Sequence, residues 1–148
     1  MPDPYDLARF VQAQESAGTY GRAIAELRRG HKESHWMWFV FPQIAGLGRS
    51  ATAKHYALAS MAQARAYADH SILGPRLLEC STIVAGHTDR SAEQIFGSID
   101  ALKLRSSMTL FCRAIPAERV FQDLLDAFFS GRPDPATDEQ LALQDQSP

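Results

Sequence analysis

Apolar residues recur at intervals of three and four along most of the chain, which is the spacing of one face of an α-helix. The first such stripe begins at Leu7 and ends before Gly18. The second follows Thr19, a good N-cap residue, and stops at Gly30. Further segments with this spacing, each ended by a nearby glycine or proline, cover about residues 71–85, 99–114 and 117–130. The pattern predicts an α-rich fold.

Three short motifs indicate where further helices begin. In each, a Ser or Thr that can cap a helix is followed three residues later by Gln, which is the capping-box pattern. The three pairs are Ser60 with Gln63, Ser91 with Gln94, and Thr137 with Gln140. Each pair precedes a helix-like segment, so the motifs also favour an α-rich fold.

One segment, Trp36–Phe41, has the aromatic-rich composition of a β-strand. No second strand-like run exists in the sequence for it to pair with, and an isolated strand leaves its backbone groups without partners. We therefore predict a short helix that is capped by Ser34 and buried on most sides. It should end at Phe41, because a residue before proline disfavours the helical conformation.

These elements predict an all-α fold, a single compact bundle-like helical domain of about seven to nine helices over residues 3–143. Residues 144–148 have little to bury and are expected to form a frayed C-terminal tail. The length of 148 residues fits one domain, and the 45% hydrophobic content is enough to fill its core. With 22% charged residues and a net charge of −2, the composition excludes a disordered chain and a histone-like basic protein.

The small net charge conceals an uneven distribution. Residues 22–76 carry eight basic and three acidic side chains, whereas residues 118–148 carry two basic and seven acidic ones. Two explanations stay open: the stretches partly neutralise each other, or the first forms a basic pocket for an anionic small molecule. Direct nucleic-acid binding is not expected, because the positive charges are spread over 55 residues and no predicted helix has a dense basic face.

The sequence also bears on the compartment of the protein. Its longest apolar run, Trp36–Phe41, is far shorter than the roughly 20 residues that cross a bilayer, and its start does not resemble a signal peptide. Cys80 and Cys112 lie on apolar helix faces in no paired motif, as expected of buried thiols in a reducing compartment. A disulfide or a reactive thiol is the alternative. We therefore expect a cytoplasmic protein with no membrane association.

Candidate chemistry gathers first between residues 31 and 50. This segment holds both tryptophans of the chain, Trp36 and Trp38. The polar side chains beside them are His35, Gln43 and Arg49. An aromatic wall beside such groups could stack a flat ring and hold a phosphate or a carboxylate. The alternative is an apolar central helix whose flanking polar groups cap it.

Two further segments add candidates. Gly46–Ser50 combines two glycines with Arg49, and its backbone N–H groups would suit an anion. A flexible turn whose final serine caps the next helix is the alternative. In Lys103–Ser107, the side chains of Lys103 and Ser106 share a helix face, so the lysine could activate the serine as a nucleophile. A solvated helix face with close packing explains the same pattern.

Familiar catalytic and cofactor motifs are absent from the sequence. It contains no Gly-rich phosphate loop, no HExxH zinc motif, no GxSxG nucleophile motif and no paired cysteines. Its five histidines lack the spacing of metal ligands. We therefore expect neither a bound metal nor a cofactor.

Three strings, Ser34–Gln43, Gly46–Ser50 and Lys103–Phe111, resemble the domain of unknown function 1810 family, sometimes labelled calpastatin-like. The likeness extends over about residues 3–143. The calpastatin label implies a protease inhibitor, whose inhibitory segments are disordered, whereas this chain is predicted to be compact. A likeness in size, helical content and aromatic-plus-polar site to the NADAR group, which is linked to ADP-ribose and NAD metabolism, implies a nucleotide-like or ADP-ribose-like ligand.

The candidate site residues fall into two sets. The catalytic candidates are His35 as general acid or base, Lys103, and Ser106. The ligand-binding candidates supply an aromatic wall, anion-binding guanidinium groups and polar contacts: Trp36, Trp38, Arg49, Arg105, Gln43 and Ser50. Three functions stay open at this point: a small hydrolase or transferase, a non-catalytic binding module, and an antitoxin-like or inhibitor-like interaction domain. The substrate, the reaction and the oligomeric state are open as well.

Overall fold

The computed structural model describes residues 2–145. Within that range the chain forms helices joined by loops, with no strand and one isolated bridge between Ile44 and Leu58. In chain order the elements are α1 (Ala8–Glu15), the 3₁₀ turn η1 (Ser16–Gly18), α2 (Thr19–Arg29), α3 (Met37–Val40), α4 (Ala51–Tyr56), α5 (Met61–Asp69), α6 (Leu73–Ala85), α7 (Ala92–Ala114), α8 (Val120–Phe129) and α9 (Pro135–Asp145). The predicted all-α fold is confirmed. No helix in the described range is long and apolar enough to cross a bilayer.

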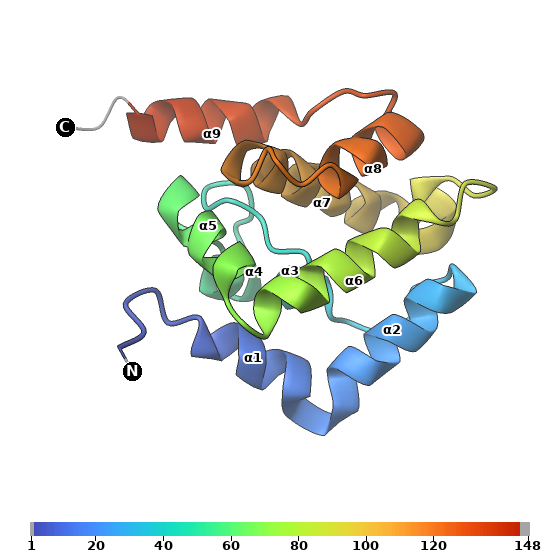
Figure 1. Cartoon of the computed structure of the whole chain (residues 1–148), viewed down its shortest axis with the longest axis horizontal. Coiled ribbons are helices and arrows are strands. Elements are labelled where there is room, and N and C mark those ends of the chain that lie inside the picture. The colour runs from blue at the N-terminus through green and yellow to red at the C-terminus, as the bar shows by residue number, and fades with distance from the viewer. Residues whose placement is uncertain (1, 146–148) are drawn as a thin grey trace.

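The helices enclose one hydrophobic core around α7. This helix packs against α5, α8 and α9, while α6 packs against α2, α5 and α8. Figure 1 shows α1 and α2 along the lower edge, α9 along the upper edge, and α6 crossing between them. Because several helices cover α7, most of its second half is buried, and it is the element on which the candidate site is built.

Aromatic side chains fill much of this core. The ring centroids of Trp36, Phe41 and Phe96 lie 6.1–6.4 Å apart in tilted or edge-on arrangements. A second group includes Tyr67 and Phe111, whose centroids are 5.7 Å apart. Such pairs stabilise a core beyond the burial of their apolar area. The aromatic run that could have formed a strand is thus the short buried helix α3 with its flanking residues, as predicted.

Serine caps are present at three helix starts, and the capping-box motifs predicted two of them. Ser91 accepts the backbone N–H of Gln94, and the side chain of Gln94 accepts the backbone N–H of Ser91, which completes a capping box at the start of α7. Ser60 accepts the backbone N–H of Gln63 at the start of α5. Ser50 caps α4 in the same way. Each cap satisfies a backbone donor that the helix itself leaves without a partner.

Three other predicted helix starts are wrong by one to three residues, and at two of them the serine or threonine binds a carboxylate instead of capping the helix. The helix α3 begins later than Ser34 allows, and Ser34 instead donates its hydroxyl to Glu26. The helix α9 begins before Thr137, whose backbone N–H donates to Asp134. Thr19 is the first residue of α2 rather than its cap.

The helix predicted over residues 99–114 is longer than expected and kinked. It begins at Ala92 and continues to Ala114, but Gly97 inside it has φ 81° and ψ 165°. Only glycine adopts this conformation readily, so the helix breaks there and a second helical stretch begins at Ser98. A single glycine inside a helical pattern does not distinguish a kink from a tolerated residue, which is why the sequence did not predict it.

The last helix, α9, extends to Asp145 and includes the first two residues of the predicted tail. Gln144 donates its side-chain N–H to the carbonyl oxygen of Ala59 at 2.7 Å, which ties the end of α9 to the loop before α5. Residues 146–148 of the predicted tail lie outside the described residues.

Gly74, in the first turn of α6, lies where there is no room for a side chain. A Cβ atom there would lie 2.1 Å from the backbone carbonyl oxygen of Ala68. We expect Gly74→Ala to lower the free energy of unfolding by about 2 kcal/mol, because backbone must move to relieve the contact. Gly21→Ala on α2 is the control, since its methyl group meets no atom within 4 Å. Urea denaturation checks both, and equal stability of the two variants would contradict the prediction.

Candidate ligand-binding groove

Two adjoining hollows lie where the loop before α3, the kink of α7 and the start of α9 meet. Each has a volume of about 350 Å³, and both are lined by Ile99 and Lys103. The first hollow is also lined by Lys32, His35, Trp38, Phe96, Gly97 and Asp100, among others. The second is also lined by Gln43, Leu47, Leu102, Ser106, Asp134 and Ala136, among others. We call the two hollows together the Lys103 groove, and its size is typical of small-molecule sites.

Lys103 lies at the junction of the two hollows. Its Nζ is 4.5 Å from the centre of the Trp38 ring and 3.3 Å from Oδ1 of Asp100. The other carboxylate oxygen of Asp100 is 2.8 Å from Nζ of Lys32, whose side chain is only 7% exposed. Two ammonium groups therefore share one carboxylate, and the cluster keeps a net positive charge beside an aromatic face.

The kink in α7 adds to the positive potential of the first hollow. The helix restarts at Ser98, after Gly97, and the N-terminal end of a helix carries a partial positive charge. Gly97, Ser98 and Ile99 all line the hollow, so an anion bound there would lie against this helix start. Asp100 occupies the first turn, where a carboxylate is favoured for the same electrostatic reason.

A buried carboxylate holds the loop before α3. Glu26 is 3% exposed and accepts hydrogen bonds from the backbone N–H groups of Glu33 and Ser34, the Ser34 hydroxyl and the Trp36 indole N–H. Burial by itself raises the pKa of Glu26, but these hydrogen bonds outweigh burial and lower the pKa to about 2. The carboxylate is therefore charged at neutral pH and fixes the loop that leads into the groove.

Apolar side chains form the rim of the groove. Ile99 is 70% exposed and Leu102 is 64% exposed. Leu47 and Trp38 lie nearby in the two hollows and are partly buried. Exposed apolar side chains next to a charged cluster give the mixed surface that binds a ligand with both a ring and a charged group.

Part of the site proposed from the sequence comes together in the fold. The proposed residues that line the Lys103 groove are His35, Trp38, Gln43, Lys103 and Ser106. They come from the loops on both sides of α3, from α3 itself and from α7, so tertiary packing is needed to assemble them. His35 is exposed, whereas Trp38 and Gln43 are half-buried.

The other proposed residues do not line the groove. Trp36 is fully buried, and its indole N–H is bound to the buried carboxylate of α2. Arg49 and Ser50 are exposed at the start of α4, which Ser50 caps. Arg105 donates guanidinium N–H groups to two carbonyl oxygens in the loop before α9. Arg105 thus ties that loop to α7 and does not face the hollows.

Ser106 is held by groups other than Lys103. Its hydroxyl lies 2.8 Å from a carboxylate oxygen of Asp134, and the same oxygen accepts the hydroxyl and backbone N–H of Thr137. This network fastens the start of α9 to α7. The Nζ of Lys103 is paired with Asp100, and no hydrogen bond joins Lys103 to Ser106 in the described part of the chain. A nucleophile and its base are therefore not paired here.

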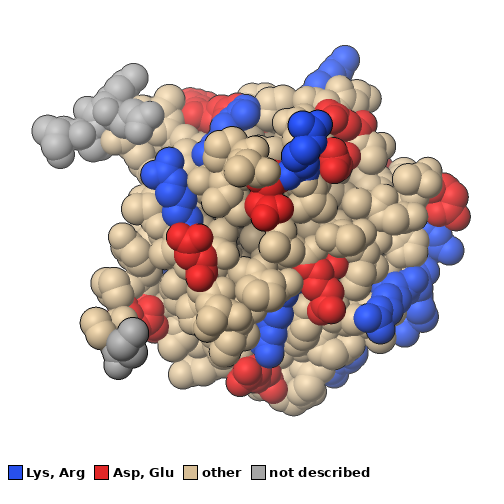
Figure 2. Space-filling model, viewed as in Figure 1, with Lys and Arg blue, Asp and Glu red and all other residues tan. Residues whose placement is uncertain are grey.

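The basic residues of the first half of the chain do not gather in the groove. Figure 2 shows Lys and Arg concentrated at the lower right, where α2 lies in Figure 1. The exposed arginines of α2 are Arg22, Arg28 and Arg29. Lys32 is the basic residue of this half that lines the groove. The positive charge of the groove thus comes from two lysines, one in the loop after α2 and one in α7.

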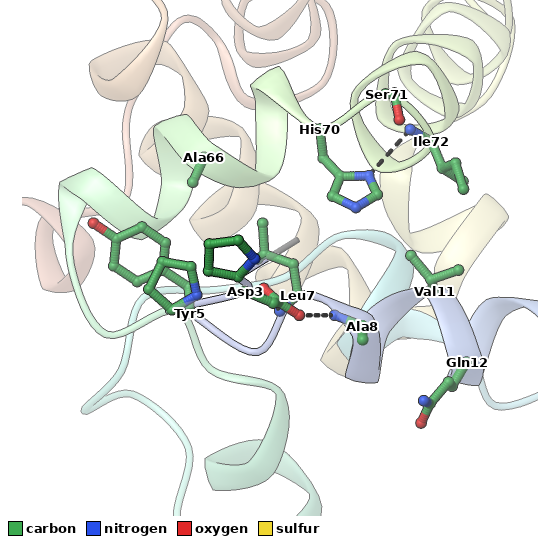
Figure 3. A pocket seen from close by; sticks show the side chains of 12 residues that line it. Asp3, Tyr5, Leu7, Ala8, Val11, Gln12, Ala66, His70, Ser71 and Ile72 are labelled. Atoms are coloured by element: carbon green, nitrogen blue, oxygen red, sulfur yellow. Dashed lines mark hydrogen bonds between the residues drawn. The ribbon is translucent and has the colours of Figure 1, made fainter.

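A hollow larger than either half of the Lys103 groove lies elsewhere (Figure 3). It has a volume of about 690 Å³ and is bounded by the N-terminal segment, α1 and the end of α5. Its lining is mostly apolar and contains none of the site residues proposed from the sequence. Charge and chemistry, rather than size, therefore single out the Lys103 groove as the candidate site for an anion.

The family described as "Protein of unknown function (DUF1810)" matches residues 4–141, nearly the whole chain. The chain belongs to the DUF1810 family. The resemblance carried by the strings Ser34–Gln43, Gly46–Ser50 and Lys103–Phe111 is thereby confirmed. The DUF1810 description names no ligand, reaction or partner.

A solved structure has the same fold as this DUF1810 chain. It is the crystal structure of the conserved hypothetical protein Rv1873 from Mycobacterium tuberculosis, which is 51% identical in sequence and superposes with a TM-score of 0.91. The match covers 95% of this chain and 99% of Rv1873. Among curated proteins, none matches the chain. The comparisons thus support the fold over nearly its full length.

Some residues that line the groove of this DUF1810 chain were not proposed from the sequence, notably Lys32, Phe96 and Asp100. Asp100 lies three residues before Lys103, so helical spacing could have placed this pair on one face. Lys32 lies in the aromatic-rich segment but shows no pattern of its own. Phe96 reaches the hollow because the helix breaks immediately after it, and the sequence alone does not reveal that break.

Proposed function

We propose that this DUF1810 protein binds an anionic small molecule with a flat ring, of the nucleotide or ADP-ribose type, in the Lys103 groove. The observation that carries the proposal is the position of Lys103 at the junction of two hollows, with its Nζ 4.5 Å from the centre of the Trp38 ring. The Trp38 ring holds the ammonium group at this junction. The phosphate of the ligand pairs with the ammonium group, and its ring packs on the apolar side chains of the second hollow.

The first hollow suits the anionic part of the ligand. Lys32 and Lys103 supply positive charge, and the helix start after Gly97 supplies oriented backbone dipoles. Asp100 contacts both ammonium groups and so fixes their positions before a ligand arrives. The exposed imidazole of His35 at the edge of the hollow adds an N–H donor.

The second hollow suits the ring of the ligand. Ile99 and Leu102 offer exposed apolar surface, and the partly buried Leu47 lies with them in the lining. Gln43 lies in the same hollow, and its amide can both donate to and accept from the polar edge of a base. Binding there would cover apolar area that is now in water, which favours association.

The arrangement supports a binding module more than an enzyme. The hydroxyl of Ser106 is held by Asp134, and the ammonium group of Lys103 is paired with Asp100. Nucleophilic catalysis would need the serine and a base within hydrogen-bond reach of each other. Binding needs only the charge and shape that the groove provides.

A thermal-shift experiment with ADP-ribose, NAD, AMP and ribose tests the proposal. The three phosphate compounds are expected to raise the melting temperature, and ribose is not. At a free concentration a hundred times the Kd, a ligand stabilises the folded state by about 2.7 kcal/mol, which is roughly 5–10 °C for a chain of this size. No shift with any phosphate compound at millimolar concentration would overturn the proposal.

Replacing the central lysine should remove this effect without unfolding the protein. We expect Lys103→Met to weaken binding of the phosphate compounds by at least about tenfold, because the charge-assisted contact is lost. Lys54→Met on α4 is the matched control, since Lys54 is exposed and does not line the groove. Isothermal titration calorimetry measures both, and an equal loss in the two variants would point to non-specific charge attraction.

A protein partner is the second candidate for the same groove. The observation that favours it is the exposure of Ile99 and Leu102, at 70% and 64%, on one face of α7. Large exposed apolar side chains are typical of interaction surfaces. The thermal-shift experiment separates the two candidates, because a surface that binds only protein predicts no stabilisation by any of the four small molecules.

A further inference from the structure

A hollow beside α1 is separate from the Lys103 groove and differs from it in chemistry. It lies between the N-terminal segment, α1, the end of α5 and the turn into α6, with a volume of about 690 Å³ (Figure 3). Most of its wall is apolar and is formed by Pro2, Pro4, Leu7, Val11, Ala66 and Ile72. A hollow of this size and lining fits a small molecule rather than a few waters.

Hydrogen bonds hold the N-terminal wall of this hollow in place. The carboxylate of Asp3 accepts the backbone N–H groups of Leu7 at 2.8 Å and Ala8 at 2.9 Å. The guanidinium group of Arg9 donates to the carbonyl oxygens of Tyr5 and of the residue after it. The segment before α1 is therefore fixed against the start of that helix, and the hollow exists before any ligand binds.

His70 supplies a directed donor on the opposite wall. Its Nδ1 accepts the backbone N–H groups of Ile72 at 3.1 Å and Leu73 at 3.3 Å. In the neutral ring the proton is therefore on Nε2. Figure 3 shows this second ring nitrogen directed toward Leu7 and Val11, into the hollow. Among the described residues it has no hydrogen-bond partner.

The charge of this hollow differs from that of the Lys103 groove. The carboxylate of Asp3 lies in its lining, and hydrogen bonds from the backbone N–H groups of Ala8 and Leu7 lower the pKa of Asp3. The carboxylate is thus charged at neutral pH, and no lysine or arginine is among the residues that line the hollow. A phosphate or carboxylate ligand would be repelled there, whereas an uncharged oxygen would accept the N–H of His70.

We infer that this hollow binds an uncharged, largely apolar small molecule whose carbonyl or hydroxyl oxygen accepts a hydrogen bond from Nε2 of His70. The inference does not depend on the function proposed for the Lys103 groove. The two sites would then take ligands that differ in charge, an anionic one in the Lys103 groove and a neutral one in this hollow.

Three probes of similar size test the inference by NMR titration of the ¹⁵N-labelled full chain. Acetophenone has a ring and a carbonyl oxygen, ethylbenzene lacks the oxygen, and benzoate carries a negative charge. Acetophenone is expected to shift the amide signals of residues 3–12 and 66–73 saturably. Ethylbenzene and benzoate should each bind at least roughly fivefold more weakly than acetophenone. For ethylbenzene the cause is the loss of one hydrogen bond, and for benzoate it is charge repulsion.

Two matched variants on α5 locate the binding. Ala66→Phe places a ring in the hollow and should abolish the acetophenone shifts. Ala62→Phe adds the same ring at an exposed position that does not line the hollow, and should leave the shifts unchanged. Helical circular dichroism verifies that both variants are folded. Absence of saturable shifts at millimolar acetophenone, or shifts that persist in Ala66→Phe, would overturn the site. Equal binding of ethylbenzene or benzoate would overturn the assigned ligand class.

Discussion

Replacing Glu26 with glutamine is expected to lower the free energy of unfolding at pH 7 by about 3 kcal/mol. The carboxylate accepts hydrogen bonds from Glu33, Ser34 and Trp36. A glutamine side chain offers one oxygen in place of two and turns an NH₂ group toward donors that it cannot satisfy. The loss should appear as a lower midpoint in urea denaturation. Glu33→Gln is the control, because the side chain of Glu33 is 62% exposed.

The pH dependence of stability provides a second readout of this variant. The pKa of Glu26 in the folded chain is about 2, below its ordinary value of 4.5. A lowered pKa stabilises the folded state above pH 4.5, and this contribution is lost as the pH falls toward 2. In the wild type it should fall by about 2 kcal/mol between pH 4.5 and pH 3. The difference between wild type and Glu26→Gln should shrink over this range, and a constant difference would contradict the assignment.

Replacing Trp36 with alanine should cost about 4 kcal/mol of stability, because the ring is fully buried and its removal leaves a cavity in the core. Trp36 packs against Phe41 and Phe96, and its indole N–H donates to Glu26. Trp38→Ala should cost only about 1 kcal/mol, since that ring is half-buried at the surface of the groove. Urea denaturation followed by circular dichroism compares the two variants.

For ligand binding the order should be reversed: replacing Trp38 should matter and replacing Trp36 should not. Trp38→Ala is expected to remain folded and to lose the stabilisation by ADP-ribose, because the ring beside Lys103 is gone. Trp36→Phe keeps most of the core packing and should retain that stabilisation. If Trp36→Ala does not fold, Trp36→Phe still tests the structural role, because it removes the indole N–H that donates to Glu26. Equal stability losses in Trp36→Ala and Trp38→Ala would contradict the distinction.

Much of the helical framework follows from local patterns. Serines followed three residues later by glutamine mark the starts of α5 and α7, because that spacing satisfies backbone donors within a single turn. The starts of α3 and α9 could not be predicted in this way. Ser34 and Thr137 are bound to carboxylates, Glu26 and Asp134, and such competition between partners is not visible in a short motif.

The candidate site was predicted only in part, and composition explains why. An aromatic-rich segment indicates that its rings are either buried in the core or stacked in a binding site. The segment does not show which ring has which of these two roles. Trp36 and Trp38 are two residues apart, so they point in different directions from α3 and its start: one into the core and one toward Lys103. Arg105 was proposed for anions because it is basic, yet backbone carbonyl oxygens across the fold take its donors.

The sequence by itself determined that this chain is one all-α domain and a member of the DUF1810 family, since apolar periodicity, caps and long specific strings are local properties. The tertiary structure decided which polar residues meet. Lys32 and Lys103 share Asp100 because the loop after α2 crosses the kink of α7, a contact between residues far apart in the chain. Burial and the geometry of hydrogen-bond partners depend on such long-range packing, and they are what separate groove residues from core residues of the same chemical type.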